Sequence, residues 1–283
     1  MLHAKKADFN ALSGRFHISP VTARIIRNRD IESEAEFDRY LNGSLEDLYS
    51  PGLLPDREEA VQRICRAVQE KRRLRIVGDY DIDGVCSTAI LYKGFKRIGA
   101  CADYVIPERI RDGYGINEHI IEAAAADGIQ TIVTCDNGIA AISQIALAKE
   151  LGLEVIITDH HDIQTNEETG EDLMPPADVI VNPKRRDSRY PWTEICGAMV
   201  VFKLVGALYE AYGISRKEWL ELLELAAIAT VGDVMKLKDE NRIVVKEGLK
   251  RLAVTGNPGL KSLIYKNALD PANISAYHIG FVL

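Results

Sequence analysis

Apolar and polar positions along the middle of the chain form blocks that predict helices and strands in turn. From residue 57, apolar side chains recur at the spacing of an amphipathic helix, as at Ala60, Ile64 and Ala67. Continuous apolar runs then predict strands at 74–81, 102–107, 129–138 and 153–162. Amphipathic blocks between and after them predict helices at 84–99, 117–128 and 140–152. Apolar strands that alternate with helices indicate an α/β fold with a mainly parallel sheet flanked by helices.

The pattern differs on either side of this block. The first 55 residues are polar, with short helices expected at 20–30 and 33–43, and they end in a Pro/Gly-bearing connector. From Gly197 the pattern turns helical, with apolar helices expected at 197–213, 216–234 and 241–254. We therefore predict an N-terminal lead-in (1–55), an α/β core (56–196) and a helical continuation (197–283). The closing ISAYHIGFVL is apolar to its end, as expected of a chain cut inside a domain.

Composition adds few constraints. The 283 residues are 47% hydrophobic and 27% charged, which is typical of a globular protein. A net charge of -7 gives no overall attraction to nucleic acid or acidic membranes, although local basic patches or bound cations could still hold a polyanion. Five scattered cysteines, no apolar signal segment and no membrane-length run lead us to expect a cytoplasmic protein with reduced thiols and no membrane partner.

Three carboxylates stand at alternate positions where the first predicted strand ends. The stretch RIVGDYDIDG places Asp79, Asp81 and Asp83 directly behind an apolar run. On an extended segment, alternate side chains leave from the same face, so these carboxylates would repel one another and would lose water in a cleft. We infer that a cation holds them together.

Similar side chains follow the other strands. Asp136 lies in TCDNG, the residues Asp159, His160 and His161 lie in TDHHD, and Asp233 ends an apolar helix in ATVGDV. Because ligands bind beyond the carboxyl ends of strands in an open α/β sheet, these groups should converge on one cleft. One aspartate alone is usually a turn former or helix cap, and tandem histidines alone are usually packing or surface residues. The prediction therefore depends on their joint occurrence in successive β-α units.

The donor types indicate the cation. Carboxylate oxygen and imidazole nitrogen suit Mn²⁺, Mg²⁺ or Zn²⁺, and the surplus of oxygen favours Mn²⁺ or Mg²⁺. The candidates include no cysteine, which argues against a structural zinc site. An aspartate shared by two cations about 3.5–4 Å apart would form a two-metal centre for phosphoryl chemistry. We predict two divalent cations, Mn²⁺ or Mg²⁺, as cofactors.

The ordered motifs GDYDIDG, TCDNG and TDHHD resemble the first three motifs of the DHH phosphoesterase superfamily. The longer stretches VIPERIRDGYGIN, VNPKRRDSRYPWTEICGAMVVFKL and IATVGDVMKL resemble its RecJ-like branch, and the resemblance runs from about Leu53 onward. It implies metal-dependent 5′→3′ exonuclease activity on phosphodiester bonds of single-stranded DNA, in DNA repair and recombination. A helicase and a single-strand-binding protein are candidate partners.

The resemblance also implies roles for residues at matching positions. Asp81 would bind one metal and Asp83 the other, and Asp136 would bridge both. His160 and Asp233 would complete the shell of the second metal.

The catalytic residues implied in the same way are Asp136 and His161, with His161 facing the scissile phosphate. Asp159 would orient its neighbours, as is expected around metal-binding histidines. Asp79 would cap the following helix or contact a metal through water.

The sequence departs from the family pattern in two places. Some relatives have a histidine four residues before the first metal-binding aspartate, where this chain has Val77. RecJ-like chains usually continue after IGFVL into a motif of the type GP-x-x-N-A-x-GR and a second, substrate-binding domain, which we expect to be absent here.

Basic loop residues are candidates for contacts with substrate phosphates. They are Arg109 and Arg111 in PERIRDGYGIN, and Lys184, Arg185 and Arg186 in NPKRRDSRY. Such residues can neutralise a nucleic-acid backbone, although each alone is equally well explained as a solvated loop charge.

Polar and aromatic neighbours are similarly ambiguous. Asn117 could contact a phosphate or cap the next helix. Tyr114, Tyr190 and Trp192 could stack on bases, although packing is the more common role of such side chains.

Three functions remain open from the sequence. The first is the single-stranded-DNA exonuclease. The second is a DHH phosphodiesterase of short oligonucleotides or cyclic dinucleotides, and the third is a non-catalytic platform protein with the DHH fold. The NP-x-x…YP and GDV segments favour the nuclease. A platform has no reason to keep clustered charge, which is costly to bury.

Overall fold

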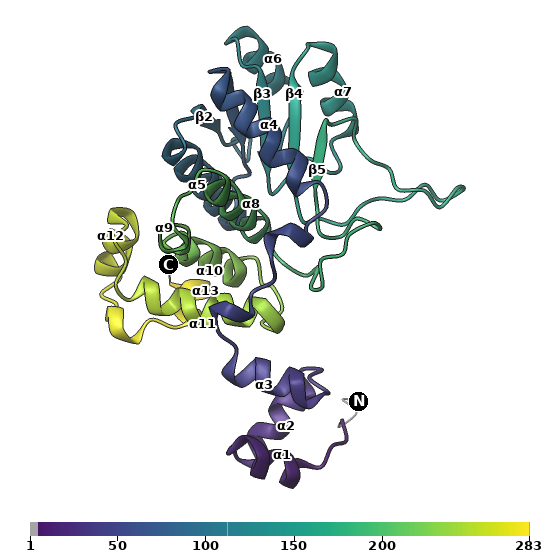
Figure 1. The fold of residues 1–283 in the computed structure, drawn as a ribbon. Coiled ribbons are helices and arrows are strands. Elements are labelled where there is room, and N and C mark those ends of the chain that lie inside the picture. Colours follow the sequence, from purple (N-terminus) through teal and green to yellow (C-terminus); the bar gives the residue numbers. More distant parts are fainter. Residues whose placement is uncertain (1–4, 112, 283) are drawn as a thin grey trace.

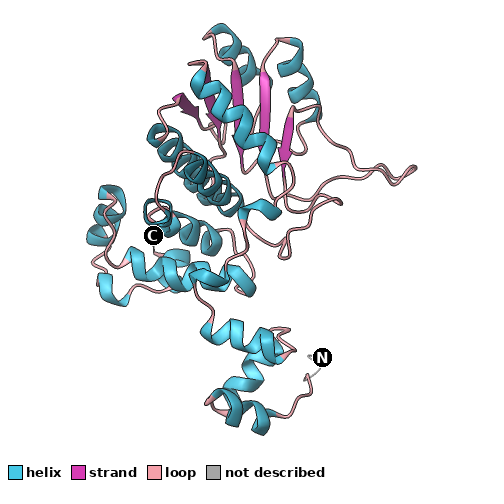
Figure 2. Cartoon of the chain, viewed as in Figure 1, coloured by secondary structure: helices cyan, strands magenta, loops and turns pink. Residues whose placement is uncertain are grey.

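The computed structural model describes residues 5–111 and 113–282. Five strands form one parallel sheet in the order β2-β1-β3-β4-β5 (Figure 2). They are β1 (Arg73–Val77), β2 (Cys101–Val105), β3 (Thr131–Cys135), β4 (Glu154–Thr158) and β5 (Val179–Val181). The predicted parallel α/β fold is thus confirmed. The strand order reverses between β1 and β3, and in open α/β sheets ligands bind beyond the carboxyl ends of the strands at such a point.

Helices cover both faces of the sheet (Figure 1). One face packs against α4 (Arg57–Gln69), α5 (Ile82–Arg97) and α8 (Gly197–Ala211), and the other against α6 (Glu118–Ala126) and α7 (Ile142–Glu150). Successive strand residues supply opposite cores: Val133 joins the first, and Ile132 joins the second. Burial on both faces explains why these strands read as continuous apolar runs.

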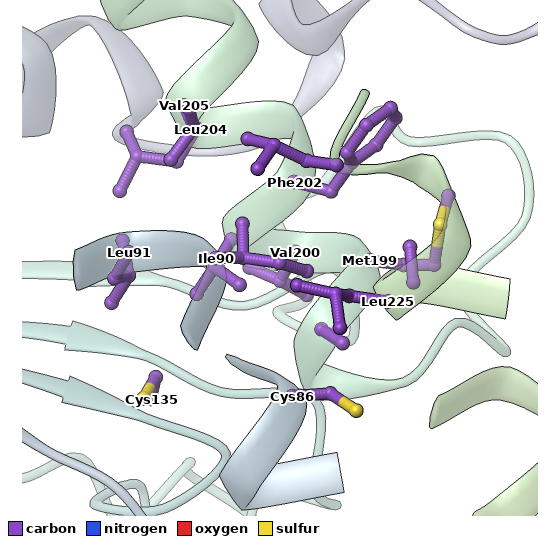
Figure 3. Close-up of a cluster of buried hydrophobic side chains, with 14 of the residues drawn as sticks. Cys86, Ile90, Leu91, Cys135, Met199, Val200, Phe202, Leu204, Val205 and Leu225 are labelled. Atoms are coloured by element: carbon purple, nitrogen blue, oxygen red, sulfur yellow. The ribbon is translucent and has the colours of Figure 1, made fainter. Parts of the chain in front are cut away.

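The chain after α8 is helical and shares the first of these cores. Its helices are α9 (Arg216–Leu220), α10 (Leu223–Gly232), α11 (Asp239–Leu252), α12 (Pro258–Lys266) and α13 (Ala276–Phe281), with a 3₁₀ turn at Pro271–Asn273. Figure 3 shows Ile90 and Leu91 of α5 among apolar side chains of α8, together with Leu225 of α10. The last residue of α10, Gly232, lies against Ile82 at the start of α5, so the end of α10 is close to the start of α5.

Three N-terminal helices form a small body of their own at the opposite end of the molecule from the sheet (Figure 1). They are α1 (Phe9–Phe16), α2 (Pro20–Asn28) and α3 (Glu34–Asn42), followed by 3₁₀ turns at Leu45–Asp47 and Pro51–Leu53. Phe16 stacks on Phe37 inside them, with ring centroids 5.6 Å apart. Arg242 of α11 donates to the carbonyl of Tyr40 at 2.6 Å, which attaches α3 to the helical continuation.

Some expectations about elements are wrong. The helix expected over 216–234 is interrupted between Leu220 and Leu223, so it forms two helices, α9 and α10. The strand β5 and the helices α1, α12 and α13 lie where no element was predicted. The predicted strands also ran too far, because each ends before the acidic residues that follow it.

In the described part of the chain, no helix combines the length and the apolar character needed to cross a bilayer. The five cysteines are free thiols.

Candidate metal centre

The three carboxylates after β1 lie in three different backbone settings. Asp79 is buried in the loop, and Asp81 caps α5, where its Oδ1 accepts a hydrogen bond from the amide of Gly84 at 2.9 Å. Asp83 lies in the first turn of α5. The expectation of one extended face is therefore wrong, because β1 ends at Val77 and a helix begins soon after.

Asp83 links α5 to the start of α8. It is buried, and its two oxygens accept hydrogen bonds from the amides of Gly197 at 2.6 Å and Ala198 at 2.8 Å. These amides begin α8. The N-cap residue of this helix, Cys196, makes no side-chain hydrogen bond to them, so Asp83 takes the place of the cap. An anion is favoured at this end of a helix, so these two bonds fix the position of the Asp83 side chain beyond the carboxyl ends of the strands.

Asp136 follows β3 in a left-handed backbone conformation, with φ of 61°. Its carboxyl group is buried, and neither oxygen has a hydrogen-bond partner among the described residues. Burial raises the pKa of Asp136, and the negative charges of Asp83 and Asp81 raise it further. A Cβ on Gly197 would lie 2.7 Å from the Asp136 Cβ, so only glycine allows α8 to start this close. The site thus buries an ionisable group whose charged form a cation would stabilise.

His160 is surrounded by three carboxylates. Its Nε2 lies 3.1 Å from Asp136 Oδ1, 3.5 Å from Asp83 Oδ2 and 3.7 Å from Asp233 Oδ2. Burial lowers the pKa of His160, which favours the neutral imidazole that binds metals. The pKa of Asp233, which ends α10, is raised to about 6 by burial and by Asp83 and Asp81.

These donors form two groups that share His160. One consists of Asp83, His160 and Asp233, and the other of Asp136, His160 and His161, with the ligand atoms of each group within 4.8 Å of one another. Oxygen and imidazole donors, together with the unpartnered Asp136 oxygens, fit a hard divalent cation such as Mn²⁺ or Mg²⁺.

Two predicted ligands stand outside these groups. Asp79 accepts a hydrogen bond from the amide of Gly115 at 3.0 Å, while its buried Oδ2 has no hydrogen-bond partner in residues 5–111 and 113–282. Asp81 caps α5 through one oxygen, and its charge contributes to the raised pKa values of Asp136 and Asp233. Ligation by either residue stays a prediction.

Asp159 makes the contacts that an orienting residue needs. Its Oδ1 lies 2.7 Å from His161 Nδ1 and accepts the amide of His160 at 2.7 Å, and its Oδ2 accepts the amide of Ile139 at 2.9 Å. Burial disfavours the charged form of Asp159. Hydrogen bonds outweigh this effect and hold the pKa of Asp159 below its usual value, and the bond from His161 contributes most. The same contact raises the pKa of His161.

Sequence reasoning missed two asparagines that connect the loops of the site. The side-chain amide of Asn137 donates to the carbonyl of Val77 at 3.0 Å, and its oxygen accepts the amide of Ile116 at 3.1 Å. Asn182 donates to the carbonyl of His161 at 3.0 Å. Both are fully buried beyond a strand end, and that position is the only signal the sequence offered.

Two of the basic candidates lie close to the site. Lys184 binds Asp162 at 2.8 Å, and its positive charge partly opposes the burial that raises the pKa of Asp233 and adds to the burial that lowers the pKa of His160. The Arg109 guanidinium lies 5.1 Å from the ring centre of Tyr80, in the loop of the first carboxylates.

Other phosphate candidates make contacts within the protein. Arg185 bonds Asp187 through two nitrogens at 2.9 and 2.7 Å, and it also contacts Asp56 and the carbonyl of Ile180. The side chain of Asn117 accepts the amide of Ile120 at 3.0 Å, which caps α6.

The remaining polar and aromatic candidates differ in position. Arg186 pairs with Asp172 at 2.9 Å, and Arg111 lies 3.8 Å from Glu108.

Tyr190 is buried, with its hydroxyl donating to Glu240, and Lys238 lies over the ring of Trp192. Tyr114, in contrast, lies at the metal centre, where its hydroxyl donates to the carbonyl of Asp136 at 2.8 Å.

Comparison with known proteins identifies relatives. The family model described as "DHH family, N-terminal domain" matches residues 73–230. Curated proteins named single-stranded-DNA-specific exonuclease RecJ are similar to this chain. That of Bacillus subtilis is 37% identical over 96% of this chain and 33% of its own length. That of Escherichia coli is 34% identical over 94% of this chain and 46% of its own length. The chain thus spans about a third to a half of these relatives.

Solved structures that are similar to this chain carry the same name as the curated relatives. An exonuclease RecJ bound to manganese superposes with a TM-score of 0.70 at 33% identity, covering 81% of this chain and 55% of that one. RecJ from Thermus thermophilus in complex with Mn²⁺ gives a TM-score of 0.75 at 29% identity, covering 97% of this chain and 37% of that one. A magnesium complex from the same organism gives a TM-score of 0.66 at 25% identity, covering 97% of this chain and 34% of that one.

Proposed function

The chain belongs to the DHH family, and on this basis we propose that it is a divalent-metal-dependent exonuclease that hydrolyses phosphodiester bonds of single-stranded DNA in the 5′→3′ direction. The observation that carries the proposal is the buried, unpartnered carboxyl group of Asp136 beside His160 Nε2. A protein that only served as a platform would gain nothing from this arrangement, since burying such a group is costly.

The proposed metal ligands are Asp81, Asp83, Asp136, His160 and Asp233, with Asp79 as a further candidate. When bound, two Mn²⁺ or Mg²⁺ ions would supply a nucleophile from water and stabilise the negative charge that develops on the phosphate.

The protein's own groups would position these reactants. Asp159 would fix the orientation of His161, whose raised pKa favours the protonated ring that pairs with a phosphate oxygen. Lys184 and Arg109 would contact phosphates of the strand near the scissile bond. Arg185 and Asn117 would do so only after exchanging the internal contacts described above.

The substrate assignment draws on the relatives, whose name specifies single-stranded DNA. A role in DNA repair and recombination, a cytoplasmic location, and a helicase or single-strand-binding protein as partners complete the proposal. Because the chain spans only part of these relatives, a phosphodiesterase of short oligonucleotides or cyclic dinucleotides is the second candidate.

One experiment separates these functions. The purified chain is incubated with Mn²⁺ and with three substrates: a 5′-phosphorylated single strand labelled at its 3′ end, the matching duplex, and a dinucleotide. We expect progressive shortening of the single strand from its 5′ end, little cleavage of the duplex, and no cleavage after chelation. Preferential cleavage of the dinucleotide would favour the second candidate. The absence of metal-dependent hydrolysis in protein that binds Mn²⁺ would contradict both.

A further inference from the structure

We propose that Tyr114 is a positioning residue of the metal centre and that its hydroxyl, rather than its ring, performs this role. The loop between β2 and α6 carries Tyr114 across the carboxyl ends of β1 and β3. The expected effect on kcat rests on the proposed exonuclease function, whereas the expected effect on Mn²⁺ affinity depends only on the geometry of the site.

Three successive residues attach this loop to the site. The Tyr114 hydroxyl donates to the carbonyl of Asp136 at 2.8 Å, and the next amide, that of Gly115, donates to Asp79 Oδ1 at 3.0 Å. The amide of Ile116 then donates to the side chain of Asn137 at 3.1 Å. The loop is therefore bonded to the residues that follow both β1 and β3.

The bond to Asp136 fixes a peptide in an unfavourable conformation. A non-glycine residue at φ of 61° costs about 1 kcal/mol or more, and surrounding contacts must compensate for it. A donor on the Asp136 carbonyl holds the orientation of this peptide, and with it the direction in which the Asp136 carboxylate points. Tyr114 supplies that donor from a loop more than twenty positions earlier in the chain.

The same hydroxyl also contacts the second histidine. Its oxygen lies 3.2 Å from His161 Nε2, and the two rings meet edge to face with centroids 5.8 Å apart. The other nitrogen of His161 is bonded to Asp159. Tyr114 thereby completes a chain of contacts from Asp159 through His161 to the backbone of Asp136.

The competing explanation is that the Tyr114 ring stacks on a base. The side chain is 49% exposed and meets Tyr80 edge to face, so part of the ring is accessible. Stacking needs the ring and tolerates loss of the hydroxyl. The two explanations therefore predict opposite results for Tyr114→Phe.

The test compares Tyr114→Phe, Tyr114→Ala and the parent. The matched control is Tyr104→Phe, which alters an exposed tyrosine of β2 that meets Tyr92 edge to face. Mn²⁺ affinity is measured by titration calorimetry, kcat and KM on a single-stranded oligonucleotide, and folding by thermal melting. For Tyr114→Phe we expect an unchanged KM and a melting temperature lower by about 2–4 °C, because one hydrogen bond is lost. We expect kcat to be lower by about tenfold and Mn²⁺ affinity to be weaker by about tenfold.

A loss of either kcat or Mn²⁺ affinity in Tyr114→Phe, without a change in KM, supports the role of the hydroxyl. The inference is overturned if Tyr114→Phe equals the parent and the Tyr104→Phe control in kcat and Mn²⁺ affinity, whatever Tyr114→Ala does to KM. If the parent itself lacks nuclease activity, the proposed function fails, and the Mn²⁺ affinities still decide whether Tyr114 positions the site.

Discussion

Asp136 combines three features that each destabilise a folded protein. It is a buried carboxylate, its oxygens have no hydrogen-bond partner within the described chain, and its backbone is left-handed. Nearby, Asp79 and His160 each keep one buried side-chain atom that has no hydrogen-bond partner in the part of the chain that the structure describes. Such costs concentrate at functional sites, and here a divalent cation would offset them.

Asp136→Asn should therefore separate metal binding from stability. Asparagine adopts the left-handed conformation readily and carries no charge, so metal-free protein should gain about 1 kcal/mol in unfolding free energy. Mn²⁺ affinity should fall by at least about tenfold because a charged ligand is lost. Urea unfolding in chelator and titration calorimetry measure the two effects. The exposed Asp38→Asn is the control, and Mn²⁺ affinity equal to that of the parent would contradict the assignment.

Asp233 should give the metal-free protein a specific pH dependence. Its pKa of about 6 in the folded state exceeds the value near 4 of an unfolded chain, so between these values the folded state retains a proton that the unfolded state has released. Raising the pH from 4 to 7 should thus destabilise the parent relative to Asp233→Asn. The expected difference is on the order of 1 kcal/mol, since water screens the partly exposed side chain. The measurement is chemical unfolding in chelator at several pH values. If the unfolding free energies of the parent and Asp233→Asn changed equally between pH 4 and pH 7, the raised pKa would be contradicted.

The sequence predicted the ionisable side chains that meet at the site, but not the contacts that hold them. Asp83, Asp136 and His160 could be found because each lies at or just beyond the end of a predicted strand. Asn182 and Tyr114 act through hydrogen bonds to backbone atoms of distant segments, and no local pattern records such pairing.

At the scale of elements, the site forms where helix ends meet strand ends. The amides that begin α8 point at Asp83 of α5, while α10 ends at Asp233. Four of the five strands could be predicted from their apolar runs. The three-residue β5 is too short for a periodic signal. At the break between α9 and α10, apolar side chains continue at helical spacing (Trp219, Leu222, Leu223) and no glycine or proline marks a helix end.

Gly197→Ala tests how closely the start of α8 must approach Asp136. The new Cβ would lie 2.7 Å from the Asp136 Cβ, so the helix start must move and weaken its bonds to Asp83. We expect a loss of about 2 kcal/mol in unfolding free energy and weaker Mn²⁺ binding. Gly14→Ala, in α1 with no atom within 4 Å of the added Cβ, should be neutral or stabilising. If both substitutions changed the unfolding free energy and Mn²⁺ affinity equally, α8 would not need to start this close to Asp136.

At the scale of the whole molecule, a buried ion pair joins the N-terminal connector to the helical continuation. Lys203 of α8 donates to Glu240 of α11 at 2.8 Å and to the carbonyl of Tyr49 at 2.6 Å, and Tyr190 donates to the same glutamate. Both charged side chains are fully buried. The pair, with its hydrogen bonds to Tyr49 and Tyr190, thus fixes four chain segments to one another.

Lys203→Met should destabilise the protein by about 3 kcal/mol, because it leaves the Glu240 charge buried without its cation. Adding Glu240→Gln should recover at least half of this loss, because it removes the unpaired charge. Chemical unfolding measures both, and Mn²⁺ affinity should stay at the parent value throughout. A double variant as unstable as Lys203→Met would contradict this explanation of the pair.

We infer that side chains from separate β-α connections hold divalent cations beyond the carboxyl ends of β1 and β3. Anomalous diffraction from a crystal soaked in Mn²⁺ tests it most directly. We expect two peaks about 3.5–4 Å apart, bounded by Asp83, Asp136, His160 and Asp233. Peaks confined to other parts of the surface, with none in contact with Asp136 or His160, would contradict the claim.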